Sequence, residues 1–388
     1  MTAGPSRREY LLTLAGTGVA ALAGCTDGDD NPTPTPQVMP SAIGGWPMFG
    51  AGPDNTGVAP EESGPTTSIV EQWRFPTDRQ VYASPAVVDN SVYVGSNDGN
   101  LYALSAQTGG ERWRFETDGL VRSSPAVGDG SVYVGSDDFT LYSLSTADGS
   151  EQWRFETGYW IRGGPTVVDD TVYVGSDDDH VYAISTADGS EQWAFETAGS
   201  VRTTPAVVEG TVYVGTQGDT IHAISADDGT EQWTFETGDS IDASPAVASG
   251  SVYAGTAEGI VYALSAADGS EQWRFETEDE IHSSPAVADG SVYVGSNDEN
   301  VYAISAADGG EQWTFETGDE VHASPAVVGG NVYVGSNDNS LYVVSAPEGT
   351  QQWRFETGGS VGSSPAVTDG IIYVGSSDDN VYALRSTE

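Results

Sequence analysis

From residue 69 to the C-terminus, apolar residues occur in short runs that are separated by turns rich in Gly and Asp. The runs are rich in Val, Tyr, Ile and Leu, and their β-branched and aromatic residues favour β-strands. One representative stretch predicts four strands, at residues 120–127, 131–135, 141–145 and 151–157. Asp148-Gly149 predicts a hairpin turn between the last two, because both residues tolerate a positive φ. Apolar residues on both faces of the second strand indicate a sheet that is covered on both sides.

These runs repeat with a constant period of 40 residues. Eight Trp residues follow the spacing: Trp73, Trp113, Trp153, Trp193, Trp233, Trp273, Trp313 and Trp353. Two further series have the same period, one of Pro from Pro85 to Pro365 and one of Tyr from Tyr93 to Tyr373. Several residue series locked to one period indicate a solenoid or a propeller.

The proline series fixes the orientation of each repeat. Pro lacks an amide N–H, so the strand that carries it must lie at the edge of its sheet. The innermost strand of a propeller blade is such an edge, and it lines the central channel. Small residues beside the first Pro, such as Ala83, Ser84 and Ala86, suit a crowded axis. Radial closure also leaves only short exposed strand edges.

The two ends of the chain indicate how many blades there are. The C-terminal repeat supplies only three strands and stops at Tyr382-Ala383-Leu384. The missing fourth strand is found at the start of the pattern, at residues 69–75. We therefore predict an all-β fold: an eight-bladed β-propeller with four antiparallel strands per blade, in which an N-terminal strand completes the last blade and closes the ring.

The N-terminal residues have a different composition. Residues 1–24 are typical of an export signal, and the pair Arg7-Arg8 resembles a twin-arginine (Tat) signal. Leu22-Ala23-Gly24-Cys25 resembles a lipobox, which predicts cleavage before Cys25 and a lipid on its sulfur. A plain secretory signal with an incidental Cys is the alternative. Residues 25–42 are rich in Thr, Pro and Asp and predict a spacer, so we assign 43–388 to the propeller.

The charge balance is strongly acidic, with a net charge of −45 and no Lys. A disordered acidic chain would be poor in aromatic residues, whereas this chain has 10 Trp, 18 Tyr and 10 Phe. The acidic residues therefore cover the surface of a folded protein. Nucleic-acid binding is excluded as a function, because it requires Lys and Arg to neutralise phosphates. An acidic, Lys-free surface resembles the proteins of salt-loving archaea, in which salt screens the repulsion between carboxylates.

The segment Ala147-Asp148-Gly149 followed by Trp153, with its equivalents in the other repeats, resembles the tryptophan-docking motif of the pyrroloquinoline-quinone (PQQ) repeat propellers. Residues 46–57 are similar to the usual lead-in of that family, and the resemblance covers residues 46–388. It implies that each Trp packs between neighbouring blades. The family includes quinoprotein dehydrogenases and also cofactor-free scaffolds of the BamB type, so the resemblance alone assigns no function.

Three features of the sequence argue against catalysis. The repeats hold their spacing without insertions, the single Cys excludes the vicinal Cys pair of the dehydrogenases, and no hydrolase or metalloprotease motif occurs. We therefore predict a non-enzymatic, monomeric, cell-surface scaffold that binds a protein partner, is joined to the membrane only through a lipid anchor, and has no cofactor or metal. The alternatives are a PQQ-dependent oxidoreductase and a surface binder of a small anion or glycan.

The residues that differ most between repeats lie just before each inner-strand Pro. Three residues before it stand Tyr82, Arg122, Arg162, Arg202, Asp242, His282, His322 and Gly362. We expect them, with Tyr159 and Trp160, to surround one mouth of the channel and to form the binding site. One arc of the mouth is basic and aromatic, and the opposite arc carries Asp242 and the two His.

Two interpretations of the three Arg remain open. They bind an acidic partner or anion, or they offset the negative charge of the protein itself. Asp242, His282 and His322 are residue types that ligate metals, but they belong to three separate blades, and we predict no metal site.

Overall fold

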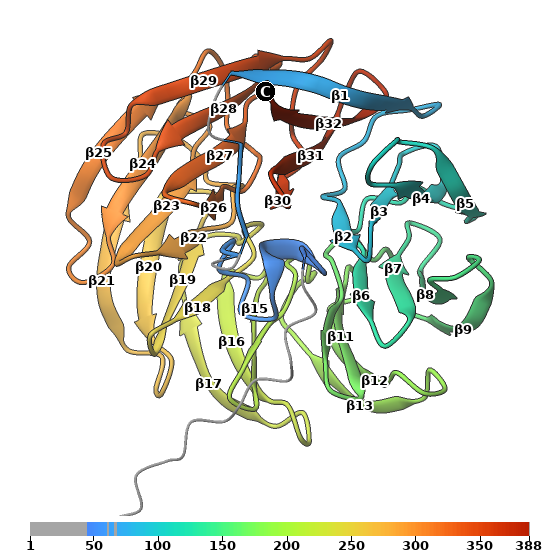
Figure 1. Cartoon of the computed structure of the whole chain (residues 1–388). Coiled ribbons are helices and arrows are strands. Elements are labelled where there is room, and N and C mark those ends of the chain that lie inside the picture. The colour runs from blue at the N-terminus through green and yellow to red at the C-terminus, as the bar shows by residue number, and fades with distance from the viewer. Residues whose placement is uncertain (1–44, 60–61, 66–67, 388) are drawn as a thin grey trace, which may run out of the picture. The chain divides into compact units, whose positions relative to one another are not determined.

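The computed structural model describes residues 45–59, 62–65 and 68–387, and the predicted signal peptide and spacer, including Cys25, lie outside them. The described residues form eight four-stranded antiparallel sheets that surround a central axis (Figure 1). Within this part of the chain, no helix is long and apolar enough to cross a membrane. The predicted eight-bladed propeller is confirmed.

The first four blades follow one another along the chain. Their strands are β2 (Ala86–Val88), β3 (Ser91–Gly95), β4 (Asn100–Ser105) and β5 (Glu111–Glu116); β6 (Ala126–Gly128), β7 (Ser131–Gly135), β8 (Thr140–Ser145) and β9 (Glu151–Glu156); β10 (Thr166–Val168), β11 (Thr171–Ser176), β12 (His180–Ser185) and β13 (Glu191–Glu196); and β14 (Ala206–Val208), β15 (Thr211–Gly215), β16 (Thr220–Ser225) and β17 (Glu231–Glu236).

The remaining blades have the same order. Their strands are β18 (Ala246–Ala248), β19 (Ser251–Gly255), β20 (Ile260–Ser265) and β21 (Glu271–Glu276); β22 (Ala286–Ala288), β23 (Ser291–Gly295), β24 (Asn300–Ser305) and β25 (Glu311–Glu316); β26 (Ala326–Val328), β27 (Asn331–Gly335), β28 (Ser340–Ser345) and β29 (Gln351–Glu356); and β30 (Ala366–Thr368), β31 (Ile371–Ser376), β32 (Asn380–Ser386) and β1 (Ile69–Pro76). We call the four strands of each blade A to D, from the axis outward.

Strand β1 closes the ring as predicted. It pairs antiparallel with β32, from Ile69 opposite Ser386 to Pro76 opposite Asn380, so that the last sheet has the order β1-β32-β31-β30 (Figure 1). The two ends of the propeller therefore share one sheet, and the chain cannot open there without breaking this ladder.

The A strands are shorter than the sequence predicts. We predicted a strand over residues 120–127, but β6 spans only Ala126–Gly128. Pro125 has no N–H to donate to a ladder. The residues before it bond to the neighbouring blade instead: the Ser84 amide donates to Ser124 Oγ at 3.0 Å, across a blade boundary.

The Trp side chains join adjacent blades. Seven of them, Trp73, Trp113, Trp153, Trp193, Trp233, Trp273 and Trp313, donate from Nε1 to a carbonyl in the C–D turn of the next blade, at 2.8–3.0 Å. Trp353 packs edge-on against Tyr333. Gly149 lies against Trp113 with φ +72°, and a Cβ there would come within 2.6 Å of the indole, so only Gly fits.

The lead-in segment, residues 45–59, closes one end of the channel, and we call it the plug. It includes a short 3₁₀ turn, η1 (Phe49–Ala51), and lies near the centre of the ring (Figure 1). Its carbonyls accept hydrogen bonds of 2.6–2.9 Å from the middle amide of the A strands in six blades; the donors are Val87, Val127, Val207, Val247, Val287 and Val327. The Asn55 side chain also donates to the carbonyls of Thr204 and Pro245, at 3.0 and 3.2 Å.

Candidate functional site: the channel mouth

The D–A and B–C loops form the mouth at the other end of the channel. Backbone hydrogen bonds join these loops within a blade, such as Asn97 N to Gln80 O at 3.0 Å, and between neighbouring blades, such as Val121 N to Ser96 O at 3.1 Å. Arg122, at the start of an inner segment, lies at the mouth, whereas Val127, five residues later, bonds to the plug. At about 3.3 Å per extended residue, the two levels are roughly 16 Å apart.

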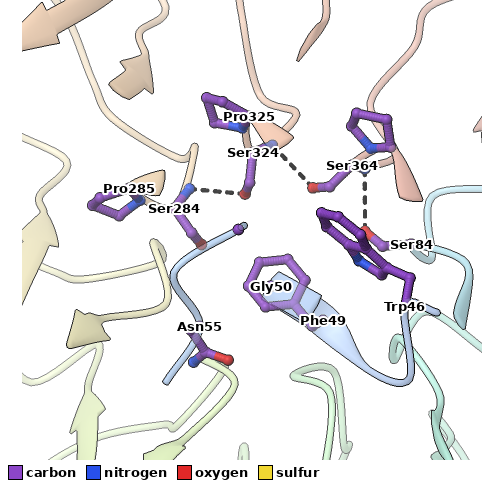
Figure 2. A pocket seen from close by; sticks show the side chains of 12 residues that line it. Trp46, Phe49, Gly50, Asn55, Ser84, Ser284, Pro285, Ser324, Pro325 and Ser364 are labelled. Atoms are coloured by element: carbon purple, nitrogen blue, oxygen red, sulfur yellow. Dashed lines mark hydrogen bonds between the residues drawn. The ribbon is translucent and has the colours of Figure 1, made fainter. Parts of the chain in front are cut away.

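A ring of hydroxyl groups lies between the mouth and the plug. The amide of Ser284 donates to Ser324 Oγ, the amide of Ser324 to Ser364 Oγ, and the amide of Ser364 to Ser84 Oγ, at 2.9–3.1 Å (Figure 2). These Ser residues, the Pro residues beside them and plug residues such as Trp46 and Phe49 line a cavity of about 10 Å³. Such a space holds one water at most, so no larger ligand fits between these hydroxyl groups and the plug.

The three Arg of the mouth share two carboxylates. Arg202 Nε lies 3.1 Å from Asp177, Arg162 lies 3.8 Å from Asp177 and 3.7 Å from Asp137, and Arg122 lies 3.8 Å from Asp137. The carboxylates are deep, with side chains 10% and 2% exposed for Asp137 and Asp177, whereas the Arg side chains are 22–38% exposed. The solvent therefore meets guanidinium groups, and the arc carries one more positive charge than negative.

Burial raises the pKa of Asp137, and Arg122 and Arg162 oppose that rise. Asp137 and Asp177 are not among the residues predicted from the sequence. Alignment of the repeats could have found them, because only these two blades have a charged residue at this B–C position. The other six blades have Asn97, Gln217, Ala257, Asn297, Asn337 and Ser377.

The opposite arc holds the two His. His282 Nδ1 lies 3.7 Å from Asp242, and the His282 and His322 rings meet edge to face with centroids 5.2 Å apart. His282 thus contacts a residue of each neighbouring blade, Asp242 on one side and His322 on the other. Burial lowers the pKa of His322, and the neighbouring His282 lowers it further. Over the described ranges, no group of three or more His, Cys, Asp or Glu is arranged to hold a metal ion.

Aromatic side chains lie exposed beside the Arg arc. Tyr159 is 41% exposed and packs against Trp160, with ring centroids 4.4 Å apart, and the Arg162 guanidinium lies 4.2 Å from the Trp160 ring centroid. Phe139, in a B–C turn, is 37% exposed and stacks on Tyr159 at 5.3 Å. Tyr82 is 42% exposed at the mouth, near Gly362. Phe139 is absent from the residues predicted from the sequence, although it is the only aromatic residue at its position among the eight repeats.

Two family models match the chain. One is described as the β-propeller of β-alanine-activating enzyme and covers residues 128–327. The other is described as outer membrane protein assembly factor BamB and covers residues 70–159 and 297–388. The chain belongs to the PQQ-repeat β-propellers. Among curated protein sequences, none matches it.

Solved structures that resemble this PQQ-repeat propeller include BamB from Moraxella catarrhalis, with a TM-score of 0.71, 18% identity, and coverage of 82% of this chain and 98% of that one. The quinohemoprotein alcohol dehydrogenase from Comamonas testosteroni has a TM-score of 0.77 and 16% identity, and the match covers 89% of this chain and 82% of that one. The computationally designed protein Ika8 has a TM-score of 0.72 and 18% identity, with coverage of 81% and 98%. At these identities the likeness is one of fold, and the fold is shared by an assembly factor and by enzymes.

Proposed function

We propose that this PQQ-repeat propeller is a non-enzymatic scaffold, held outside the cytoplasmic membrane by a lipid on Cys25, that binds a protein partner through its channel mouth. The observation that carries the proposal is the composition of the mouth. It gathers three of the four exposed large hydrophobic residues of the described chain, Tyr82, Phe139 and Tyr159, beside an exposed Arg arc. Aromatic residues and Arg are the types most enriched among the residues that dominate protein interfaces.

The two ends of the channel differ in a way that supports this choice of face. Plug residues bonded to six blades fill one end, whereas the D–A and B–C loops surround the other end. A partner that approaches the mouth therefore meets side chains that vary from blade to blade, set on a rigid ring. Sites on a rigid scaffold bind with a smaller loss of conformational freedom.

A quinone does not fit in the space between the Ser hydroxyls and the plug. Ligand pockets enclose about 300–1,000 Å³, whereas the cavity below the hydroxyl ring encloses about 10 Å³. The small size of this space favours a scaffold over an oxidoreductase that would hold its cofactor beside the plug, and we derive no reaction step through a quinone.

The test is a parallel purification, from gently solubilised native membranes at high salt, of the wild type and two variants. Arg202→Gln removes a mouth guanidinium without adding charge, and Arg354→Gln is its control on the outer strand β29, where Arg354 pairs with Glu356. We expect mass spectrometry to find one recurrent protein with the wild type and the control, and to find it depleted with Arg202→Gln. Equal recovery from both variants, or a stoichiometric quinone, would contradict the proposal.

A further inference from the structure

The B–C turn of the second blade contains a residue that the turn does not need. Phe139 has φ +74°, a left-handed conformation that is an outlier for a bulky residue. The equivalent residues of the other blades also have positive φ, and they are Gly99, Asp179, Asp219, Gly259, Glu299, Asn339 and Asp379. None of these is aromatic.

The backbone of the turn is the same whatever side chain it carries. The carbonyl of Phe139 accepts from the Thr157 amide at 2.8 Å, and the carbonyl of Asn339 accepts from the Thr357 amide at the same distance. The Phe side chain is therefore dispensable for the turn. It adds backbone strain and exposed apolar surface, and a strained residue of this kind at a surface site indicates a function.

Phe139 is part of a continuous strip. It stacks on Tyr159 with an interplanar angle of 14°, Tyr159 contacts Trp160, and Arg162 lies over the Trp160 ring. We call Phe139, Tyr159, Trp160 and Arg162 the aromatic strip. It runs along the mouth from the B–C turn of the second blade to the Arg arc.

The polar side chains at the mouth end of the strip are the guanidinium groups of the Arg arc. Guanidinium groups cannot accept hydrogen bonds, and the acceptors of this arc, Asp137 and Asp177, lie beneath them with 10% and 2% of their side chains exposed. A sugar presents hydroxyls that need donors and acceptors alike, whereas a carboxylate needs donors alone. On a chain of net charge −45, this arc is also a place where an acidic group meets positive charge.

We propose that the aromatic strip binds a polypeptide segment of the partner in which an aromatic side chain is flanked by carboxylates. The aromatic residue packs against Phe139 and Tyr159, and the carboxylates meet Arg122 and Arg162. This inference rests on the proposed scaffold function, and it specifies the chemistry of the partner.

The test measures fluorescence anisotropy with labelled octapeptides at several salt concentrations. The probe has two Glu flanking a Trp; one control replaces Trp with Ser, a second replaces both Glu with Lys, and a labelled oligosaccharide is a third. The protein variants take residues from the sister blades: Phe139→Asn, as at Asn339, and Tyr159→Gly, as at Gly119. Val70→Thr, at an exposed apolar residue of the outer strand β1, is the matched control.

We expect the Glu–Trp peptide to bind about tenfold more tightly than each control probe, with each strip variant weakening it about tenfold and Val70→Thr leaving it unchanged. The thermal midpoint of Phe139→Asn should equal or exceed that of the wild type, since Asn tolerates positive φ. The inference would be overturned if the strip variants bound the Glu–Trp peptide as tightly as the wild type does. Preference for the Lys peptide, or binding of the oligosaccharide alone, would also overturn it. If peptide binding fails while Arg202→Gln still depletes the native partner, the inference fails and the scaffold proposal stands.

Discussion

Asn55 offers a sharp test of how the plug is seated. Its side chain is 2% exposed and donates two hydrogen bonds to carbonyls of the fourth and fifth blades. Its φ of +55° is left-handed. Asn55→Ala removes both donors and places Ala in a conformation that Asn and Gly adopt more readily. Asn55→Gly removes the donors but not the freedom to adopt positive φ, so the two variants separate the two effects.

The expected loss follows from these contacts. A buried carbonyl without its donor costs about 1–3 kcal/mol, and the small cavity beside the plug, which can admit one water, favours the lower part of that range. Two carbonyls therefore give a loss of about 2–3 kcal/mol for Asn55→Gly. A left-handed Ala adds about 1 kcal/mol, which brings Asn55→Ala to about 3–4 kcal/mol. For a domain of this size, that corresponds to a fall in the melting temperature of about 5 °C.

The assay is thermal unfolding in molar salt, followed by near-ultraviolet circular dichroism. The control is Asn331→Ala, which removes a single exposed bond to the Gly329 carbonyl and should change stability by less than about 0.5 kcal/mol. If Asn55→Ala has the same melting temperature as the wild type, the Asn55 side chain does not stabilise the seating of the plug. If Ala and Gly at this position are equally unstable, backbone strain plays no part.

Three further predictions follow from other parts of the ring. Trp153→Phe should cost about 1–2 kcal/mol in chemical unfolding, because the Thr186 carbonyl loses the indole donor at 2.8 Å; an unchanged midpoint would refute the role of this bond between blades. Burial lowers the pKa of His222 below 6.5, so the folded state resists its protonation and stability should fall as the pH drops below about 6.5. His222→Tyr, the residue of the sister blades, should lessen that fall between about pH 6.5 and 5, and melting curves of equal pH dependence would contradict this. Finally, the net charge of −45 should loosen the fold in millimolar salt, and identical circular dichroism in molar and millimolar salt would exclude this effect.

The fold was predictable because the repeat makes each local signal recur eight times. The Pro series placed the inner strands, and the incomplete last repeat located its partner at residues 69–75, as the pairing of β1 with β32 confirms. The length of the A strands was not predictable, because backbone amides just before the Pro residues, such as that of Ser84, bond to a neighbouring blade. A pattern within one repeat contains no record of such contacts.

The candidate site was predictable only in part. Comparison of repeats found Arg122, Arg162, Arg202 and the two His, because they differ at one aligned position. It did not reveal that Asp137 and Asp177 share the charge of those Arg, since the B–C turns reach the mouth from another part of each repeat. The position of the plug was also not predictable. Its hydrogen bonds to the blades use backbone carbonyls, which every residue has, so no residue type marks them in the sequence.

The most direct test of the central claim, that the channel mouth is the binding face, is site-specific photocrosslinking in native membranes. A photoreactive amino acid replaces Tyr82 or Tyr159 at the mouth, or Ala187 in an exposed C–D turn at the plug end of the ring. The account predicts that both mouth positions crosslink to one and the same protein and that Ala187 does not. Crosslinks to a recurrent partner from Ala187 alone would contradict it and would place the binding face at the other end of the propeller.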